Sequence, residues 1–264
     1  MVFNPSSVER LSHVIVGAWL AGAFLVLSVS AYYILKNRHI ETAKASFKIA
    51  LVFAAVSSLL QLLTGHKSAD GVAHNQPAKL AAFEGHFDSL AVADLYLVGW
   101  VDEKTQKTEG IKIPKGLTFL LHQDFATPVR GLNSFPKNEL PRVNLVFQTY
   151  HLMVSIGMAL IGLTWFALFL WWRGALFQQK WLMMIFAWSV LLPQIANQVG
   201  WYSAEIGRQP WVVYGLLKTS DALSKSVSAQ QVWFSLLLFT FVYTLLFILF
   251  IFCLEVLESS VNMR

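Results

Sequence analysis

Residues 143–172 read VNLVFQTYHLMVSIGMALIGLTWFALFLWW and contain no Asp, Glu, Lys or Arg. A run of roughly 20 apolar residues is long enough to cross the hydrocarbon core of a bilayer. Lipid offers no hydrogen-bond partners, so the backbone of such a run must satisfy itself within a helix. The stretch therefore predicts a transmembrane helix from Val143 to Trp172.

Four other stretches have the same character, at about residues 11–35, 47–63, 181–204 and 232–257. Pro193 is expected to kink the fourth of the five spans. We predict an all-α fold class: a single integral membrane domain over residues 1–264, built as a helical bundle with five transmembrane helices. Residues 64–142 would form a long loop outside the lipid.

The composition supports a membrane protein and excludes several other classes. Of 264 residues, 56% are hydrophobic and only 13% are charged, about half the charged fraction of soluble domains. The single cysteine, Cys253, excludes zinc and iron–sulfur sites built on cysteine pairs. The net charge of +5 comes from basic residues beside apolar stretches rather than from a patch, so no nucleic acid partner is expected.

Basic residues also predict the orientation of the chain. The short loops between spans one and two and between spans three and four are rich in Lys and Arg, which favours the cytoplasmic side. The N-terminus, the loop 64–142 and the loop 205–230 would then lie outside, and the C-terminus in the cytoplasm. The basic residues concerned are Lys36, Arg38, Lys44, Lys48, Arg173 and Lys180.

Ionisable residues within spans are costly and mark candidate functional sites. His13, His151 and Met153 lie near the predicted outer ends of two spans. An imidazole and a thioether from different helices can bind a heme iron axially. His151 and Met153 are two residues apart and point to different sides of a helix, so only one could bind the same heme. Spacing does not choose between them, and an interfacial histidine with an apolar methionine is the plainer interpretation.

The fourth span ends in a second polar group. Glu205 follows Trp201 by four residues and shares its helix face. Its carboxylate could bind iron weakly, transfer a proton, or simply pair with Arg208. Gln194, Asn197 and Gln198 make the outer half of this span polar, which favours an internal site over a lipid-facing surface.

The long loop contributes a further candidate. Lys79 and Glu84 are five residues apart around a short helical run. They could bind a small polar molecule at the membrane surface and accept its proton, which is general-base chemistry. The alternative is a solvated loop whose charges have no specific role.

Four stretches together resemble subunit I of cytochrome bd-type quinol oxidases. They are NPSSVERLSHVIVGAWLAGAFLVLSVSAYYILK at 4–36, GHKSADGVAHNQPAKLAAFEGHF at 65–87, YHLMVSIGM at 150–158 and GWYSAEIGRQPWVVYGLLKTSDALS at 200–224. The resemblance covers the C-terminal part of that subunit, helices five to nine of the family. The family's first four helices are absent from these 264 residues, which leaves either a split subunit that works with a separate N-terminal chain or a truncated product. Met1 directly before the fifth-helix pattern favours a split gene.

The resemblance implies specific roles for individual residues. His13 and Met153 match the axial ligands of a low-spin heme b, with His151 as the alternative ligand where many family members have arginine. Lys79 and Glu84 match the residues that interact with quinol. Glu205 matches a ligand of a high-spin heme b, and Trp201 an aromatic residue implicated in electron transfer between hemes. Residues 207–210 form the family's GRQP signature near the hemes, which includes Arg208 and Gln209.

The same resemblance implies cofactors, partners and location. The oxygen-reacting heme, either heme d or a further heme b, would be completed by a partner chain that supplies the missing N-terminal helices. Subunit II, small accessory membrane subunits and membrane quinol are the other expected partners. The expected location is a bacterial or archaeal cytoplasmic membrane. The expected activity is quinol oxidation coupled to oxygen reduction. Its alternatives are an electron-transfer subunit without oxygen reduction and a structural subunit without hemes.

Overall fold

The computed structural model describes residues 6–89, 92–224 and 226–262. The chain divides into two compact units, Met1–Thr219 and Ser220–Arg264, which are described separately. Five of the described helices or helix pairs are long and apolar enough to cross a membrane, in agreement with the predicted fold class.

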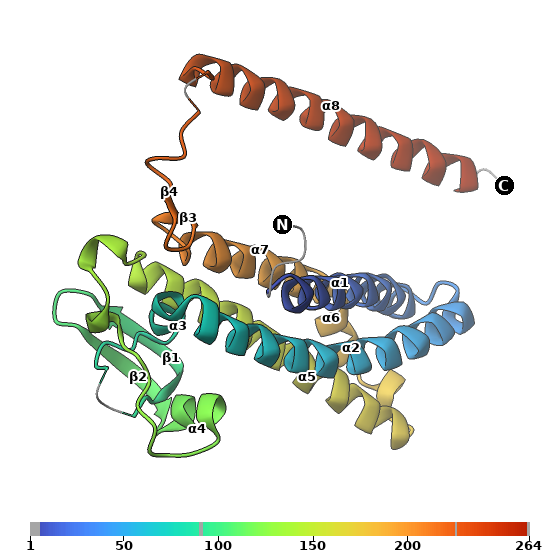
Figure 1. Ribbon diagram of the computed structural model, residues 1–264. Helices are drawn as coiled ribbons and strands as arrows, with labels where there is room; N and C mark the ends of the chain where they lie inside the picture. Colours follow the sequence, from blue (N-terminus) through green and yellow to red (C-terminus); the bar gives the residue numbers. More distant parts are fainter. Residues whose placement is uncertain (1–5, 90–91, 225, 263–264) are drawn as a thin grey trace. The chain divides into compact units, whose positions relative to one another are not determined.

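The first unit is a bundle of long helices (Figure 1). They are α1 (Ser7–Leu35), α2 (Ile40–Asn75), α5 (Val143–Trp172), α6 (Lys180–Trp188) and α7 (Leu191–Ile206). Their core is aliphatic and aromatic, with Phe47 against Phe186 at 5.0 Å between ring centroids. Ser28 on α1 also donates to the carbonyl of Ala187, 2.5 Å away. This core holds the helices at fixed positions, so polar groups at one end of the bundle can be placed precisely against one another.

Helix α2 continues well past residue 63, where the predicted span ended. It has 36 residues and is about 54 Å long at the α-helical rise, against a hydrocarbon core of about 30 Å. Its last turns pack against the start of α1, where a Cβ on Gly71 would clash with Oε2 of Glu9. The span at about residues 47–63 was predicted from apolar residues alone. Residues 64–75 are mostly polar, and a helix that leaves the lipid needs no apolar surface.

The fourth predicted span is broken into α6 and α7 at Ser189 and Val190. Pro193 lies in the first turn of α7, where it has no N–H to donate and its ring crowds the carbonyl of Ser189 four residues earlier. The expected kink is therefore confirmed, in the form of a break between two helices.

The long loop is folded rather than irregular, and it is not purely helical. It contains α3 (Pro77–Glu84), an antiparallel hairpin of β1 (Leu95–Asp102) and β2 (Lys107–Ile113), α4 (Gly116–His122), and the short 3-10 helices η1 (Leu132–Ser134) and η2 (Lys137–Glu139). The hairpin was not predicted, because its strands lie in a segment that composition marks only as outside the lipid.

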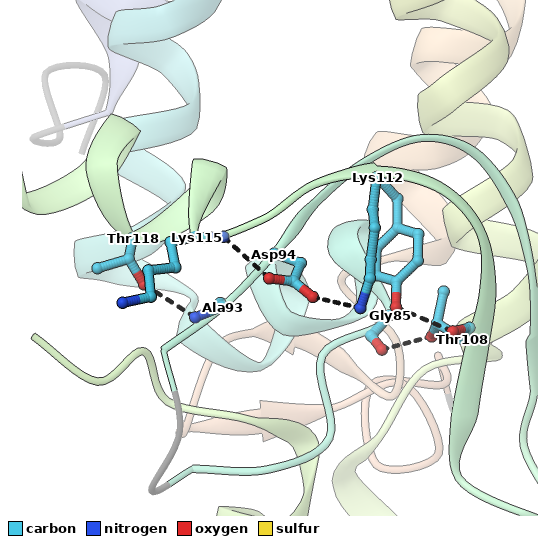
Figure 2. A network of polar contacts seen from close by, with 8 residues as sticks. Gly85, Ala93, Asp94, Thr108, Lys112, Lys115 and Thr118 are labelled. Atoms are coloured by element: carbon cyan, nitrogen blue, oxygen red, sulfur yellow. Dashed lines mark hydrogen bonds and ion pairs between the residues drawn. The ribbon is translucent and has the colours of Figure 1, made fainter. Parts of the chain in front are cut away.

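Polar contacts hold this loop together (Figure 2). Asp94 accepts hydrogen bonds from Nζ of Lys112 at 2.6 Å and from the backbone N–H of Lys115 at 2.9 Å. Thr108 on β2 donates to the carbonyl of Gly85 at 2.6 Å, directly after α3. Gly85 adopts a positive φ of 58°, which glycine tolerates without strain. The hairpin thus fixes the C-terminal end of α3.

The hairpin is also attached to the first turns of α5. The Glu103 carboxylate accepts the backbone N–H of Asn144 at 2.8 Å, a favourable position for an anion at a helix N-terminus. Gln148 donates to the carbonyl of Gly99 at 2.8 Å. Helix α3 and the start of α5 are therefore joined through one rigid hairpin.

The chain after α7 forms a small antiparallel pair, β3 (Trp211–Val213) and β4 (Leu217–Lys218). The second unit contains α8 (Ala229–Asn262). Its apolar side chains up to Cys253 are exposed within that unit, as expected of a helix whose surface faces lipid or other membrane helices.

Candidate functional site

His13 lies on α1 and faces the adjacent part of α2. Its Nδ1 is 3.2 Å from Oγ1 of Thr64, and its Nε2 is 3.1 Å from the amide nitrogen of Gln61. A Cβ on Gly65 would lie 3.3 Å from Cε1 of His13. The amide oxygen of Gln61 is buried and has no hydrogen-bond partner among the residues that the structure describes. The imidazole therefore lies between two helices, next to two polar side chains and a glycine.

Met153 on α5 likewise lies opposite a glycine of a neighbouring helix. Its sulfur lies where a Cβ on Gly200 of α7 would be only 2.6 Å away. An imidazole and a thioether on separate helices, each with a glycine opposite, form a donor set that suits a low-spin heme. The orphaned amide oxygen of Gln61 is a second sign that this region is built for a polar group. The residues present thus fit the group that the resemblance implies.

His151 is engaged elsewhere. Its Nδ1 lies 2.9 Å from the carbonyl of Phe147, and its Nε2 lies 2.9 Å from the carbonyl of Tyr96 on β1. The ring also stacks on Phe147 at 3.9 Å. Both nitrogens face backbone oxygens, which cannot rotate aside as the side-chain partners of His13 can, so neither is directed toward a metal. This geometry favours Met153 over His151 as the ligand from α5.

Lys79 and Glu84 both belong to α3, and both are buried, with exposed fractions of 5% and 1%. Burial contradicts the alternative of a solvated loop. The two side chains do not converge, because residues five apart on a helix point about 140° away from each other. Lys79 donates to the carbonyl of Ala204 at the end of α7, 2.9 Å away. Glu84 is hydrogen-bonded to Tyr150 on α5.

Burial shifts the pKa of both groups toward the same value. It raises the pKa of the Glu84 carboxyl from 4.5 to about 8, and the hydrogen bond from Tyr150 opposes this only in part. It lowers the pKa of Lys79 from 10.5 to about 8, assisted by the positive charges of Arg10 and Arg208 and opposed by Glu205. A buried carboxyl that changes charge near neutral pH can act as an acid or a base.

Glu205, at the end of α7, forms an ion pair with Arg208. Its Oε2 accepts from Nη2 of Arg208 at 2.5 Å. Both side chains are partly exposed, at 38% and 40%, while Nε of Arg208 is buried without a partner. The simple ion pair weighed for Glu205 is therefore present.

Two further predicted residues lie close to this ion pair in sequence. Gln209 accepts a hydrogen bond from Oγ1 of Thr219 at 2.7 Å and precedes a cis peptide bond to Pro210. The Trp201 ring is 58% exposed and contacts Tyr202 at 5.4 Å between centroids. Trp201 thus lies at the surface of the first unit rather than in its core.

The predictions from sequence missed Tyr150, Gln61, Gly65 and Gly200 as members of the site. Tyr150 stacks on Phe83 at 4.5 Å with the rings within 4° of parallel. Its one sequence signal was a polar aromatic residue directly before His151 in an otherwise apolar span. The roles of Gln61 and the two glycines follow from helix packing and leave no local signal.

Comparison with known proteins identifies relatives over most of the chain. A family model described as "Cytochrome bd terminal oxidase subunit I" matches residues 1–259. The Bacillus subtilis protein "Cytochrome bd ubiquinol oxidase subunit 1" is 34% identical over 98% of this chain and 58% of its own length. The Escherichia coli protein "Cytochrome bd-II ubiquinol oxidase subunit 1" is 28% identical over 94% of this chain and 61% of its own.

The fold comparison agrees. A solved bd oxidase structure from Geobacillus thermodenitrificans has a TM-score of 0.80 and 30% identity, over 93% of this chain and 56% of that one. The chain therefore spans somewhat more than half the length of the relatives it matches. It is a multi-pass membrane protein, and it belongs to the cytochrome bd terminal oxidase subunit I family.

Proposed function

We propose that this chain is the quinol-oxidising and heme-binding part of a cytochrome bd-type quinol:oxygen oxidoreductase. The observation that carries the proposal is Glu84: a buried carboxyl on α3 with one oxygen, Oε2, that has no hydrogen-bond partner in the described part of the chain. Such a group is costly to bury and is ready to accept a proton from a bound hydroxyl. The relatives named for quinol oxidation supply the substrate class.

In this proposal Glu84 accepts a proton at Oε2 from one hydroxyl of the quinol. Lys79 is the second residue proposed to interact with the quinol. Its Nζ donates to the carbonyl of Ala204, so it connects α3 to the end of α7. His13 and Met153 hold the low-spin heme b, which would accept the electrons of the quinol one at a time. The protons would be released on the outer side, where the loop 64–142 is predicted to lie.

Glu205 and Trp201 belong to the later part of the proposed electron path. Glu205 is the proposed ligand of a high-spin heme b, in which case its carboxylate must share or exchange its bond to Arg208. Gln209 and Arg208 would stabilise the negative groups of the hemes. We assign oxygen reduction to a heme d or further heme b that needs sequence beyond these 264 residues, together with subunit II and small accessory subunits.

The test is the reduced-minus-oxidised absorbance spectrum of the natively purified complex. We expect Met153→Leu and His13→Ala each to lose the low-spin heme b signal. Met158→Leu is the matched control, since Met158 lies on the same helix and is 52% exposed. An unchanged low-spin signal in Met153→Leu would overturn the ligand assignment and point to His151.

The same preparation separates the proposal from its alternative. A low-spin heme together with an oxygen-reactive heme, and oxygen consumption with quinol, would support the oxidase. A low-spin heme alone would instead support a quinol-oxidising electron-transfer subunit without its own oxygen reduction. A preparation free of heme would contradict both.

A further inference from the structure

The carboxyl of Glu84 has one partner and one vacant acceptor. The side chain is 1% exposed, and Tyr150 of α5 hydrogen-bonds to it. Oε2 is buried without any partner among the described residues. Unsatisfied buried oxygens are rare in folded proteins and call for an explanation.

The Tyr150 ring is held on two sides. One face stacks on Phe83, the neighbour of Glu84, at 4.5 Å and within 4° of parallel. Its edge meets the ring of His151 at 5.3 Å and 85°. His151 is itself fixed, because its two ring nitrogens face the carbonyls of Phe147 and Tyr96. The hydroxyl of Tyr150 therefore has little freedom to move away from the carboxyl.

Within the ranges that the structure describes, no charged side chain is paired with this carboxyl. Lys79 is on the same helix but is directed to Ala204 on α7, and Glu205 and Arg208 at that end pair with each other. From α5, Tyr150 faces the carboxyl directly, whereas His151 faces backbone oxygens. The orientation of the Glu84 carboxyl within the described site thus depends on one hydroxyl.

We infer that Tyr150 is a positioning residue for Glu84: its hydroxyl holds the carboxyl in the orientation that presents a carboxyl oxygen to the proton of the bound quinol. The inference deepens the proposed function and rests on it. Tyr150 touches neither the quinol nor a heme in this role, and acts only through Glu84. It also connects the loop helix α3 to the helix that carries Met153.

The test uses infrared spectroscopy on the purified complex, since burial favours the protonated carboxyl at neutral pH. The C=O stretching band of Glu84 is assigned by its loss in Glu84→Gln. In Tyr150→Phe the ring and its stack on Phe83 remain, and only the hydroxyl is removed. A carbonyl that loses a donor absorbs at higher frequency, so we expect the band to shift upward and quinol oxidation to slow roughly tenfold.

The matched control is Tyr96→Phe, which removes another tyrosine hydroxyl from the same region. That hydroxyl donates to the carbonyl of Thr108 at 2.9 Å, so the Glu84 band and the rate should stay as in the unmodified protein. If Tyr150→Phe does not assemble, a fluorinated tyrosine at position 150 keeps the ring and is a stronger donor. It should then shift the band downward.

The outcomes separate this inference from the proposed function. An unshifted Glu84 band in Tyr150→Phe overturns the inference, whatever the rate does. A Glu84→Gln variant that oxidises a water-soluble short-chain quinol at the unmodified rate overturns the proton-accepting role of Glu84 instead. A shifted Glu84 band in Tyr150→Phe, together with slowed quinol oxidation in both Tyr150→Phe and Glu84→Gln, supports the inference and the proposed function.

Discussion

Glu84 and Lys79 carry opposite charges at neutral pH in ordinary surroundings, yet burial moves the pKa of each to about 8. The carboxyl is therefore mostly protonated at neutral pH and becomes a better proton acceptor as pH rises. We expect quinol oxidation to increase as pH approaches about 8. The residual rate of Glu84→Gln should lack that increase, and a parallel increase in the variant would assign the ionisation to another group.

The raised pKa of Glu84 also makes the stability of the folded protein depend on pH in a definite direction. The folded-state pKa of Glu84 lies above its unfolded value of 4.5, so folding favours the protonated form. The contribution of the neutral carboxyl is fully present below pH 4.5 and is lost as pH rises through about 8. Glu84→Gln should thus raise the thermal unfolding midpoint more at the alkaline end of this window than at the acid end. Equal effects at both ends would contradict the raised pKa.

Gly200 offers a test of the Met153 assignment that leaves Met153 itself in place. A Cβ at position 200 would lie 2.6 Å from the methionine sulfur, so Gly200→Ala must displace it. The sulfur is at the end of a flexible side chain, so we expect little change in the unfolding midpoint but a weakened or altered low-spin heme spectrum. Gly157→Ala on α5 is the control, since a Cβ there meets nothing within 4 Å.

The chemistry of the candidate site could be read from residue types, but its contacts could not. His13, Met153, Lys79, Glu84 and Glu205 stand out because charged, imidazole and thioether groups near lipid are unusual. The partner of Glu84 is 66 positions away in sequence, at Tyr150, and that pairing exists only once α3 packs on α5.

At the scale of elements, the hairpin β1–β2 determines how α3 meets α5. Thr108 binds the residue after α3, and Glu103 binds the start of α5. The strands pair closely at Gly110, where a Cβ would be 2.1 Å from the carbonyl oxygen of Val98 and 2.5 Å from the Cα of Gly99. Backbone atoms cannot move aside as side chains do, so this position requires glycine.

Gly110→Ala should therefore disrupt the hairpin. Overpacking of this kind costs about 1–3 kcal/mol, and the backbone amides of residues 95–113 should exchange with deuterium faster than in the unmodified protein. Quinol oxidation should fall as α3 loses its support, while the low-spin heme spectrum is retained. Glu109→Ala, an exposed neighbour on the same strand, is the control and should change neither. Unchanged exchange in Gly110→Ala would show that the hairpin does not depend on this close approach.

The ends of a helix could be predicted closely where its sequence is apolar and uncharged, whereas the elements of the more polar segments could not. Helix α5 begins at Val143 and ends at Trp172, as its uncharged apolar run predicts. The end of α2 at Asn75 and the hairpin β1–β2 were missed. Outside the bilayer the hydrophobic pattern no longer constrains the backbone, and contacts such as Gly71 with α1 and Glu103 with α5 decide where elements end.

At the scale of the whole molecule, the candidate site residues of the first unit gather at one end of its bundle. The start of α1, the end of α2, the start of α5 and the end of α7 meet there through contacts made by His13, Lys79 and Met153. Quinol, with a polar head and an apolar tail, would reach such a group of residues from the membrane edge. The basic loops that contain Arg38 and Arg173 lie at the other ends of the same helices.

The position of the basic loops predicts which end of the bundle faces the cytoplasm. With Cys253→Ala as background, we expect Thr105→Cys in the exposed turn between β1 and β2 to react with a membrane-impermeant maleimide added to intact cells. Gln178→Cys, in the exposed connection after α5, should react only after the membrane is opened. The reverse pattern would place Lys79 and Glu84, in the loop 64–142, on the cytoplasmic side. Protons from quinol would then be released where oxygen reduction consumes them, and the proposed separation of charge across the membrane would not occur.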